Sequence, residues 1–189
     1  MDAVFINVNV GAVADDVKTG VQIKSRPRQP LDIAYCAAVL EKNGFSCSII
    51  DALILNLSDD EIVKQCKAKH VIINTSPIDR WECPYISIDK HAKLAKRIRE
   101  ATRAKIIFIG PHGTITPQMV FEKADIDLVV MGEPEHAVLE IVKALPYEEI
   151  DGIAYKKNNV LLINRPREPI EDLDQLPFPA YHLLPMDKY

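Results

Sequence analysis

Residues 105–135 read KIIFIGPHGTITPQMVFEKADIDLVVMGEPE. The stretch contains two short apolar runs, Ile106–Ile109 and Leu128–Met131, and each run ends abruptly in a glycine. Gly110 begins the sequence GPHGT, and Gly132 begins GEPE. Open parallel sheets bind their ligands where strands end on turns of this kind before a helix. The stretch therefore predicts two neighbouring strands whose ends form one ligand-binding edge.

The alternation of strand-like runs with longer segments continues through most of the chain. The segments between the runs are long enough to hold a helix. Parallel strands need crossovers of this length, and the crossovers place helices on both faces of the sheet. We therefore predict an α/β fold with a doubly wound, five-stranded parallel sheet. The predicted strands are Ala3–Val10, Ser46–Asp51, His70–Thr75, Lys105–Ile109 and Asp127–Met131.

Local signals mark the ends of the predicted helices. Pro30 suits the first position of a helix, and Asn43-Gly44 terminates that helix because glycine tolerates the left-handed backbone. Ser58-Asp-Asp-Glu61 is a capping box. Thr116-Pro117 predicts an N-cap and the first residue of a short helix. A further helix over Ile88–Thr102 has a basic outer face, which we interpret as a solvated surface.

The last quarter of the sequence differs from the rest. Two apolar runs flank Asn158-Asn159, which is a hairpin signal. Five prolines lie between Pro166 and Pro185, with acidic residues among them, and this composition predicts an extended linker without a core. The predicted division is an α/β domain at 1–146, a hairpin extension at 147–164 and a linker at 165–189.

The composition excludes broad classes of protein. The chain of 189 residues is 48% hydrophobic and 26% charged, and its net charge of −4 does not favour nucleic acid. We find no apolar run of membrane-spanning length and no signal-peptide pattern, so no membrane partner is expected.

The cysteines form no C-x-x-C motif, so reduced thiols and a cytoplasmic location are the simplest interpretation. They are Cys36, Cys47, Cys66 and Cys83.

The predicted edge suits binding better than catalysis. The sequence lacks a G-x-G-x-x-G after the first strand, a P-loop motif and clustered metal-ligating side chains. The turns offer hydroxyls, a carboxylate, glycines that would let a ligand approach the backbone, and stiff prolines. His112 is either a structural histidine or a ligand contact. A large cofactor fits this set better than a small substrate. The set is Thr75, Ser76, Gly110, Pro111, His112, Gly113, Thr114, Glu133 and Pro134.

Four segments, in order, resemble the cobalamin-binding domain of the cobalamin-dependent radical SAM enzymes. The first is PLDIAYCAAVLEKNGFSCSIIDA at 30–52, and the second is IIFIGPHGTITP at 106–117. The third is DIDLVVMGEPE at 125–135. The fourth comprises IDGIAYKKNNVLLINRP at 150–166 and IEDLDQLPFPAYHLLPMDKY at 170–189. Each motif alone is weak, whereas the four in the family's order are specific, and they cover the chain almost from end to end.

The resemblance implies a flavodoxin-like (Rossmann-like) sheet that holds cobalamin across the carboxyl ends of its strands. It implies a parent enzyme that is a radical SAM methyltransferase, with a radical SAM domain of the same polypeptide as partner. The [4Fe–4S] cluster and S-adenosylmethionine are expected only in that domain, because no CxxxCxxC occurs here. We expect no catalytic residue and no metal ligand in this chain. The residues implied to bind cobalamin are Asn9, Gly11, Thr75, Ser76, Pro77, Gly110, Pro111, His112, Gly113, Thr114, Gly132 and Glu133.

The sequence departs from the family pattern at several places. Asn9-Val10-Gly11 stands where a DxHxxG motif would supply a histidine to cobalt, so no such bond is expected. Ile109 replaces one glycine of a double glycine, and Pro134 replaces the second glycine of GEGE. Trp81 is either a loop anchor or a wall against the corrin, and Arg80 is a weaker candidate for the lower cobalt face.

Two alternative functions stay open at this point. One is an interaction or regulatory domain that kept the fold and lost the cofactor, which the departures at Ile109 and Pro134 motivate. The other is a flavodoxin-like domain that binds a different nucleotide cofactor, such as a flavin. The proline-rich tail favours an excised N-terminal domain over a natural stand-alone one.

Overall fold

The computed structural model describes residues 1–10, 28–76 and 87–189. The predictions made for Gly11, Pro77, Arg80, Trp81 and Cys83 lie outside these ranges. The described helices include none with the length and apolar character needed to cross a membrane.

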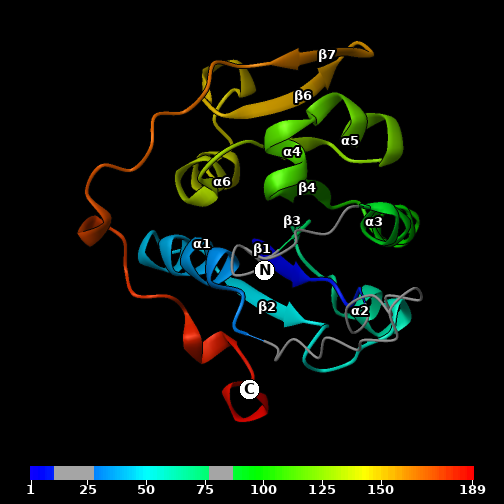
Figure 1. The fold of residues 1–189 in the computed structure, drawn as a ribbon, viewed down its shortest axis with the longest axis vertical. Helices are drawn as coiled ribbons and strands as arrows, with labels where there is room; N and C mark the ends of the chain where they lie inside the picture. Colours follow the sequence, from blue (N-terminus) through cyan, green and yellow to red (C-terminus); the bar gives the residue numbers. More distant parts are fainter. Residues whose placement is uncertain (11–27, 77–86) are drawn as a thin grey trace, which may run out of the picture.

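Seven strands form one sheet in the order β2-β1-β3-β4-β5-β6-β7 (Figure 1). β1 to β5 pair in parallel, whereas β6 pairs antiparallel with β5 and β7 antiparallel with β6. The strands are β1 (Ala3–Asn7), β2 (Cys47–Asp51), β3 (His70–Asn74), β4 (Lys105–Ile109), β5 (Leu128–Val130), β6 (Ile153–Lys157) and β7 (Val160–Ile163).

The prediction of a five-stranded sheet was wrong, because the hairpin continues the sheet. Val129 of β5 pairs with Ala154 of β6, and Ile153, Ala154 and Tyr155 are buried. An unpaired β5 would expose a row of backbone donors and acceptors at the edge of the sheet, and the hairpin satisfies them. The expected parallel arrangement of the first five strands is confirmed.

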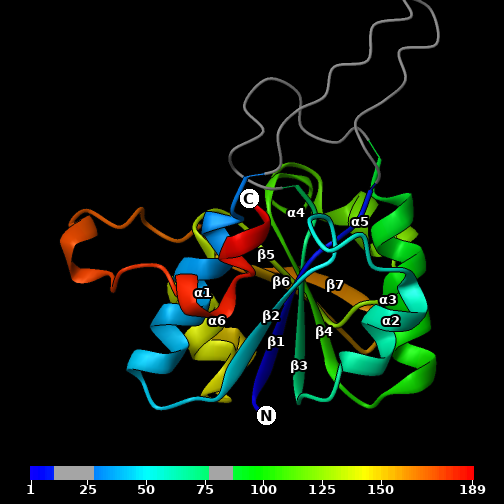
Figure 2. The ribbon, with the colours of Figure 1, turned by 90° about the horizontal axis from the view of Figure 1, so that it is seen from below.

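The helices cover both faces of the sheet. α1 (Leu31–Lys42) and α6 (Pro134–Val142) pack on one face, where β1, β3 and β4 present Phe5, Ile72 and Ile107. The opposite face is covered by α2 (Asp59–Gln65), α3 (Asp89–Ala101) and α5 (Pro117–Lys123) (Figure 2). The short α4 (Pro111–Ile115) follows β4 directly. The described residues also form four 3₁₀ turns, at Tyr147–Glu149, Leu173–Gln175, Tyr181–Leu183 and Met186–Lys188.

Most of the local end signals are confirmed. Ser58 and Glu61 form the reciprocal capping box at the start of α2. Gly44 adopts φ 80° after α1, and Asn158 and Asn159 adopt φ 52° and 66° in the hairpin turn. Two signals differ from the predictions. Pro30 is the N-cap of α1, which begins at Leu31. The hydroxyl of Thr116 caps no backbone N–H of α5 and donates instead to the carbonyl of His112 at 3.2 Å.

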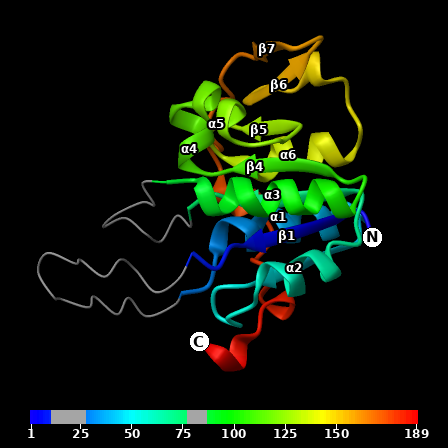
Figure 3. The ribbon, with the colours of Figure 1, turned by 90° about the vertical axis from the view of Figure 1, so that its right-hand side faces the viewer.

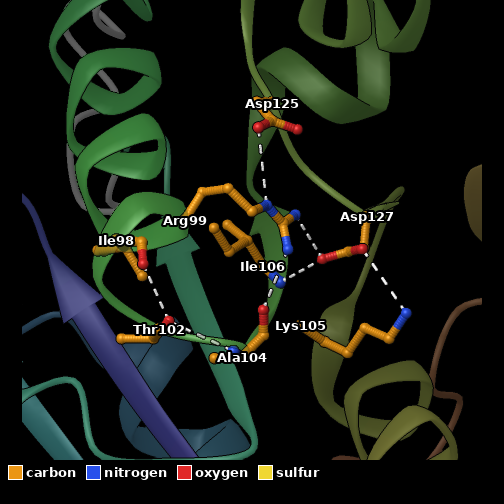
Figure 4. Close-up of polar contacts among 8 residues, drawn as sticks. All are labelled: Ile98, Arg99, Thr102, Ala104, Lys105, Ile106, Asp125 and Asp127. Atoms are coloured by element: carbon orange, nitrogen blue, oxygen red, sulfur yellow. Dashed lines mark hydrogen bonds and ion pairs between the residues drawn. The ribbon is translucent and has the colours of Figure 1, made fainter.

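The amino-terminal edge of the sheet is held by an ionic cluster (Figure 4). Asp127 Oδ2 accepts from Arg99 Nη2 at 2.7 Å and from the backbone N–H of Ile106 at 2.8 Å. Arg99 Nε also lies 3.7 Å from a carboxylate oxygen of Asp125. The basic face of α3 is therefore not uniformly solvated, since Arg99 ties the end of α3 to the start of β4 and β5.

The segment 165–189 packs on α1 and is not a bare linker. Ala180 and Leu184 are buried, and the Ala180 N–H donates to the carbonyl of Ala34 at 3.0 Å. Lys42 Nζ donates to the carbonyl of Gln175 at 3.1 Å. The expectation that this segment contributes nothing to a core was wrong, because Ala180 belongs to the core and Leu176 and Leu183 pack against it. Figure 3 shows the end of this segment at the opposite side of the molecule from the β6-β7 hairpin.

Candidate functional site

The strand order reverses direction between β1 and β3, and open α/β sheets have their ligand crevice between the carboxyl ends of the strands at such a point. The chain passes from β1 to its neighbour β2 on one side, and then returns to β3 on the other side of β1. Ligands of open α/β sheets bind at such a switch point. Asn9 follows β1 and Thr75-Ser76 follow β3, so these predicted residues lie just beyond the carboxyl ends of two neighbouring strands.

The end of β3 is bound tightly to the end of β4. The N–H and the hydroxyl of Thr75 both donate to the carbonyl of Ile109, at 3.0 Å and 2.9 Å. Thr75 is fully buried, so its hydroxyl is used inside the protein. Thr75 therefore fixes the shape of the edge and does not present its donor to a ligand.

Asn74 links β3 to the start of α1. Its Nδ2 donates to Oδ2 of Asp32 at 2.6 Å, and its Oδ1 accepts from the N–H of Ser76 at 3.1 Å. Asp32 also accepts from the N–H of Ile33 at 2.9 Å. Sequence reasoning missed Asp32, since position 32 reads only as an acidic residue in the first turn of a helix.

Ser76 leaves a polar atom available at the crevice. Its side chain is 1% exposed, and its Oγ has no hydrogen-bond partner among the described residues. Buried hydroxyls in proteins are nearly always satisfied, so an orphaned one points to a missing partner. A ligand with hydrogen-bonding groups would meet this need.

Gly110 and Gly113 are required by the packing of the protein itself. Gly110 adopts φ 103°, and a Cβ there would lie 2.9 Å from the side-chain oxygens of Asn74 and Thr75. A Cβ at Gly113 would lie 2.3 Å from Cγ1 of Val129. Protein atoms already fill the space beside both glycines. Packing alone therefore requires both glycines, and their predicted role, to let a ligand approach the backbone, stays a prediction.

Among the described glycines of the predicted site, Gly132 differs because it faces open space. It adopts φ 76°, and a Cβ there would meet no atom within 4 Å. Its N–H donates to the hydroxyl of Thr114 at 3.0 Å, and that hydroxyl donates to the carbonyl of Gly110 at 3.1 Å. Thr114 thus connects the turns after β4 and β5, and the two turns of the opening stretch form one surface.

The predicted turn Gly110–Thr114 is helical beyond its first residue. Pro111 and His112 lie in the first turn of α4, and both are half-buried. His112 interacts electrostatically with His91 of α3, which is buried. Burial first, and then His112 and Lys90, lower the pKa of His91 to about 4, so that His91 is neutral near pH 7.

Acidic groups gather where α6 begins. Burial raises the pKa of the Glu135 carboxyl, and the nearby Glu133 and Asp32 add to the effect. Oε2 of Glu135 has no hydrogen-bond partner among the described residues. Glu133 itself accepts from the N–H of Ile170 at 2.6 Å, so the predicted acceptor is engaged with the C-terminal segment. No local sequence pattern indicates that Glu135 is buried.

The corner at the end of β1 and β2 is polar and closed. Asn7 Nδ2 donates to Oδ1 of Asp51 at 2.9 Å, and both residues are buried. Asn9 Nδ2 donates to Oδ1 of Asn56 at 3.1 Å. The hydroxyl of Tyr189 donates to the other carboxylate oxygen of Asp51. Asn9 therefore sits at the crevice on a hydrogen-bonded support.

Ile109 does not obstruct the edge. Its side chain, on the last residue of β4, is 1% exposed and packs in the core cluster that includes residues of α6. Pro134 is the first residue of α6, where a missing N–H costs no helical hydrogen bond. Neither departure from the family pattern places a side chain over the crevice between β1 and β3.

The described part of the chain contains no set of side chains suited to bind a metal ion. No group of three or more His, Cys, Asp or Glu residues there is arranged to hold a metal ion. A shallow groove between α3 and α5, lined by Asp89, Lys93, Lys96 and Lys123, lies away from the strand ends. The crevice between β1 and β3 is the better candidate site because it combines the fold's usual ligand position with an orphaned polar atom.

Curated proteins of similar sequence include methyltransferases and a cyclase. An uncharacterized methyltransferase of Pyrococcus horikoshii, PH0819, is 34% identical over 167 residues, which cover 85% of this chain and 35% of the relative. The anaerobic magnesium-protoporphyrin IX monomethyl ester cyclase of Rubrivivax gelatinosus is 30% identical over 173 residues, covering 85% of this chain and 30% of the relative.

Solved structures of the same fold contain cobalamin. The radical S-adenosylmethionine methyltransferase TsrM of Kitasatospora setae, solved with cobalamin and a [4Fe–4S] cluster, matches with a TM-score of 0.64 and 17% identity over 94% of this chain and 31% of TsrM. The cobalamin-dependent radical enzyme OxsB, solved with aqua-cobalamin and S-adenosylmethionine, matches with a TM-score of 0.72 and 15% identity over 97% of this chain and 24% of OxsB. At these identities the likeness shows the fold.

The chain spans about a third of the length of the curated relatives, between 30% and 37%. The family described as B12 binding domain matches residues 27–142, from shortly before α1 to the end of α6. This match includes β2 to β5 and the turns that follow β3, β4 and β5, whereas β1 and Asn9 precede it. The chain belongs to the B12 binding domain family.

Proposed function

We propose that this region holds cobalamin across the carboxyl ends of β1, β3, β4 and β5 in a radical SAM methyltransferase. The observation that carries the proposal is the switch point between β1 and β3, where Ser76 has a buried hydroxyl without a partner among the described residues. Membership of the B12 binding domain family supports the same ligand. In the proposal the protein is cytoplasmic, and it binds neither nucleic acid nor membrane.

The described residues fit such a ligand through neutral polar groups. Asn9 and Ser76 would meet the cofactor at the crevice, and the open face of Gly132 would admit a ligand atom close to the backbone. Thr75 and Thr114 would hold the edge in shape, because their hydroxyls are already bonded within the protein. Glu133, Pro111, His112, Gly110, Gly113, Gly11 and Pro77 remain proposed neighbours of the cofactor.

In this proposal the cofactor supplies the reactive chemistry, and the protein region binds and orients the cofactor. Cobalamin, when bound, supplies a cobalt that can carry a methyl group, which is chemistry that no side chain of this region offers. The chain's own residues bind and orient the cofactor. Radical chemistry with S-adenosylmethionine and a [4Fe–4S] cluster would belong to the part of the parent protein that the relatives possess beyond this region. The methyl-transfer reaction is proposed from the names of PH0819 and of the cytidylyl-2-hydroxyethylphosphonate methyltransferase of Streptomyces wedmorensis.

Titration with aquacobalamin tests the proposal directly. The visible spectrum of the cofactor should change on addition of the protein, and cofactor and protein should coelute in gel filtration. Ser76→Ala should weaken binding by about threefold to tenfold, the value of one hydrogen bond. Ser46→Ala is the matched control, because Ser46 lies at the opposite edge, where its hydroxyl donates to Asp2 at 2.7 Å.

Two results would count against cobalamin. An unchanged spectrum together with separate elution would refute the proposal and favour the interaction domain without a cofactor. A flavin retained in the purified protein would favour the alternative nucleotide cofactor. The packing of Ile109 in the core removes one of the two reasons for the interaction-domain alternative.

A further inference from the structure

The last described residues return to the edge of the sheet that carries the candidate site (Figure 2). The hydroxyl of Tyr189 donates to Oδ2 of Asp51, the final residue of β2. Packing on α1 guides the segment there, since Ala180 and Leu184 are buried before it. A contact between positions 138 residues apart therefore closes one corner of the edge.

The carboxylate of Asp51 also accepts hydrogen bonds from β1 and from the turn that follows β2. Its Oδ1 accepts from Nδ2 of Asn7 at 2.9 Å and from the N–H of Ile54 at 3.2 Å. Asp51 is 1% exposed, so the carboxylate depends on these donors in place of water. The orientation of this one side chain thus sets the end of β1 against the turn that follows β2.

The turn at residues 52–57 carries the support for Asn9. The Ala52 N–H donates to the carbonyl of Asn7 at 3.0 Å, and the Leu57 N–H donates to the carbonyl of Ala52 at 3.0 Å. Asn56 adopts a left-handed φ of 49° within the turn, and its Oδ1 accepts from Nδ2 of Asn9 at 3.1 Å. Bonded groups therefore connect Tyr189 to Asn9 through Asp51 and the turn.

We propose that Tyr189 is a positioning residue for the candidate site, fixing Asn9 through Asp51 and the turn at 52–57. The ligand-binding part of this inference rests on the proposed function, whereas the effect on the turn does not. Coupling of this kind is reciprocal, so a ligand held against Asn9 stabilises the docked C-terminal segment as much as that segment stabilises the ligand.

Amide hydrogen exchange without ligand tests the positioning role. Tyr189→Phe removes the hydroxyl and keeps the ring. We expect the N–H groups of Ile54 and Leu57 to exchange about threefold to tenfold faster, because Asp51 loses one of its donors. The N–H of Val129, in β5, should be unaffected. Tyr181→Phe is the matched control, since Tyr181 lies in the same segment but at a different 3₁₀ turn.

Titration with aquacobalamin gives the second measurement. Tyr189→Phe should bind about threefold to tenfold more weakly than the wild type, and Tyr181→Phe should bind equally well. Saturating aquacobalamin should slow exchange of the Ala180 N–H, which bonds Ala34, in the wild type more than in Tyr189→Phe.

The outcomes separate the two proposals. Equal exchange at Ile54 and Leu57 in Tyr189→Phe and the wild type overturns the positioning role, whether or not cofactor binds. Equal affinity of the two proteins for aquacobalamin also overturns it. A wild type that binds no aquacobalamin refutes the proposed function, and the exchange comparison alone then decides the role of Tyr189.

Discussion

A methyl group on Gly110 would lie 2.9 Å from Oδ1 of Asn74. The two residues end neighbouring strands, and Asn74 is buried with both ends of its amide engaged, by Asp32 and by Ser76. The turn after β4 therefore approaches β3 as closely as a residue without a side chain permits. The opening glycine of GPHGT has a packing role that is independent of any ligand.

Gly110→Ala should destabilise the fold by about 2–4 kcal/mol, since it combines a left-handed backbone with a steric clash. Gly44→Ala provides the control, because Gly44 has φ 80° and no atom within 4 Å of the added methyl. It should lose only about 1–2 kcal/mol, the cost of the backbone alone. Urea unfolding measures both, and equal losses would show that the contact with Asn74 is unimportant.

Gly113 and Val129 should be energetically coupled. Gly113→Ala places a methyl 2.3 Å from Cγ1 of Val129, so α4 must shift at a cost of about 1–3 kcal/mol. Val129→Ala removes the opposing methyl groups. In that background Gly113→Ala should cost at least about 1 kcal/mol less than in the wild type. A double-mutant cycle by urea unfolding gives the coupling, and simple additivity would contradict the packing.

His91 should make the fold sensitive to acid. Its pKa is about 4 in the folded protein against 6.5 for the free side chain, because burial disfavours the charged ring. The unfolded chain therefore binds more protons between these values, and stability falls as the pH drops from 6.5 to 4, by at most about 3 kcal/mol. His91→Gln should flatten the dependence of unfolding free energy on pH in this window. An unchanged slope would assign the acid sensitivity to other groups.

Glu135 should have the opposite dependence. Burial raises its pKa above 4.5, so the folded protein holds the proton more tightly, and the contribution to stability is full below 4.5 and lost as the pH rises through the folded pKa. Glu135→Gln, which cannot ionise, should therefore stabilise the protein by about 1 kcal/mol at pH 7 and by less at pH 4. Thermal unfolding at the two pH values measures the difference. A destabilised variant at pH 7 would mean that the carboxylate has a favourable partner.

Asp127 should matter more than Asp125 for stability, although both face Arg99. Asp127→Asn weakens the bonds to Arg99 and to the N–H of Ile106, and should cost about 1–2 kcal/mol. Asp125→Asn should cost at most about 0.5 kcal/mol, because Asp125 is 65% exposed and 3.7 Å from Arg99. Neither change should alter aquacobalamin binding, because the cluster lies at the opposite edge. A change in affinity would show that the two edges communicate.

Local sequence signals predicted the parts of the fold that depend on local chemistry. The capping box at Ser58 needs only Glu61, three residues away, and the hairpin turn at Asn158-Asn159 needs only residues that accept a left-handed backbone. Alternating apolar runs located the five parallel strands to within a few residues at each end. These patterns depend on hydrogen bonds and burial within a short piece of chain, so they can be recognised from the sequence alone.

The parts that sequence reasoning missed are set by contacts between distant residues. Asn74 meets Asp32 over a separation of 42 residues, and Tyr189 meets Asp51 over 138. Nothing near Glu135 in the sequence indicates that α1 and α6 bury it. The hairpin was recognised, but its pairing with β5 depends on the free edge of a strand that ends more than twenty residues earlier.

The candidate site was predicted best where the motif and the strand end coincide. Ser76 and Gly132 were named from the sequence, and the packing leaves one with an orphaned hydroxyl and the other facing open space. Thr75, Thr114, Gly110 and Gly113 share the same motifs, yet their donors or their space are used within the protein. Residue type alone does not distinguish a group that shapes the edge from one that faces a ligand.

Both sides of the carboxyl edge are closed, and this gives the edge a fixed breadth. Beyond β5, the N–H of Met131 donates to the carbonyl of Gly152, and the Gly152 N–H donates to the carbonyl of Arg165, so the hairpin seals that side. Beyond β1, Tyr189 seals the end of β2. Four strand ends remain between them, spanning about 14 Å at roughly 4.8 Å per strand. The breadth of these four strand ends therefore limits how a flat ligand can lie on them. A flat molecule broader than this strip must tilt away from the strand ends or extend over a helix.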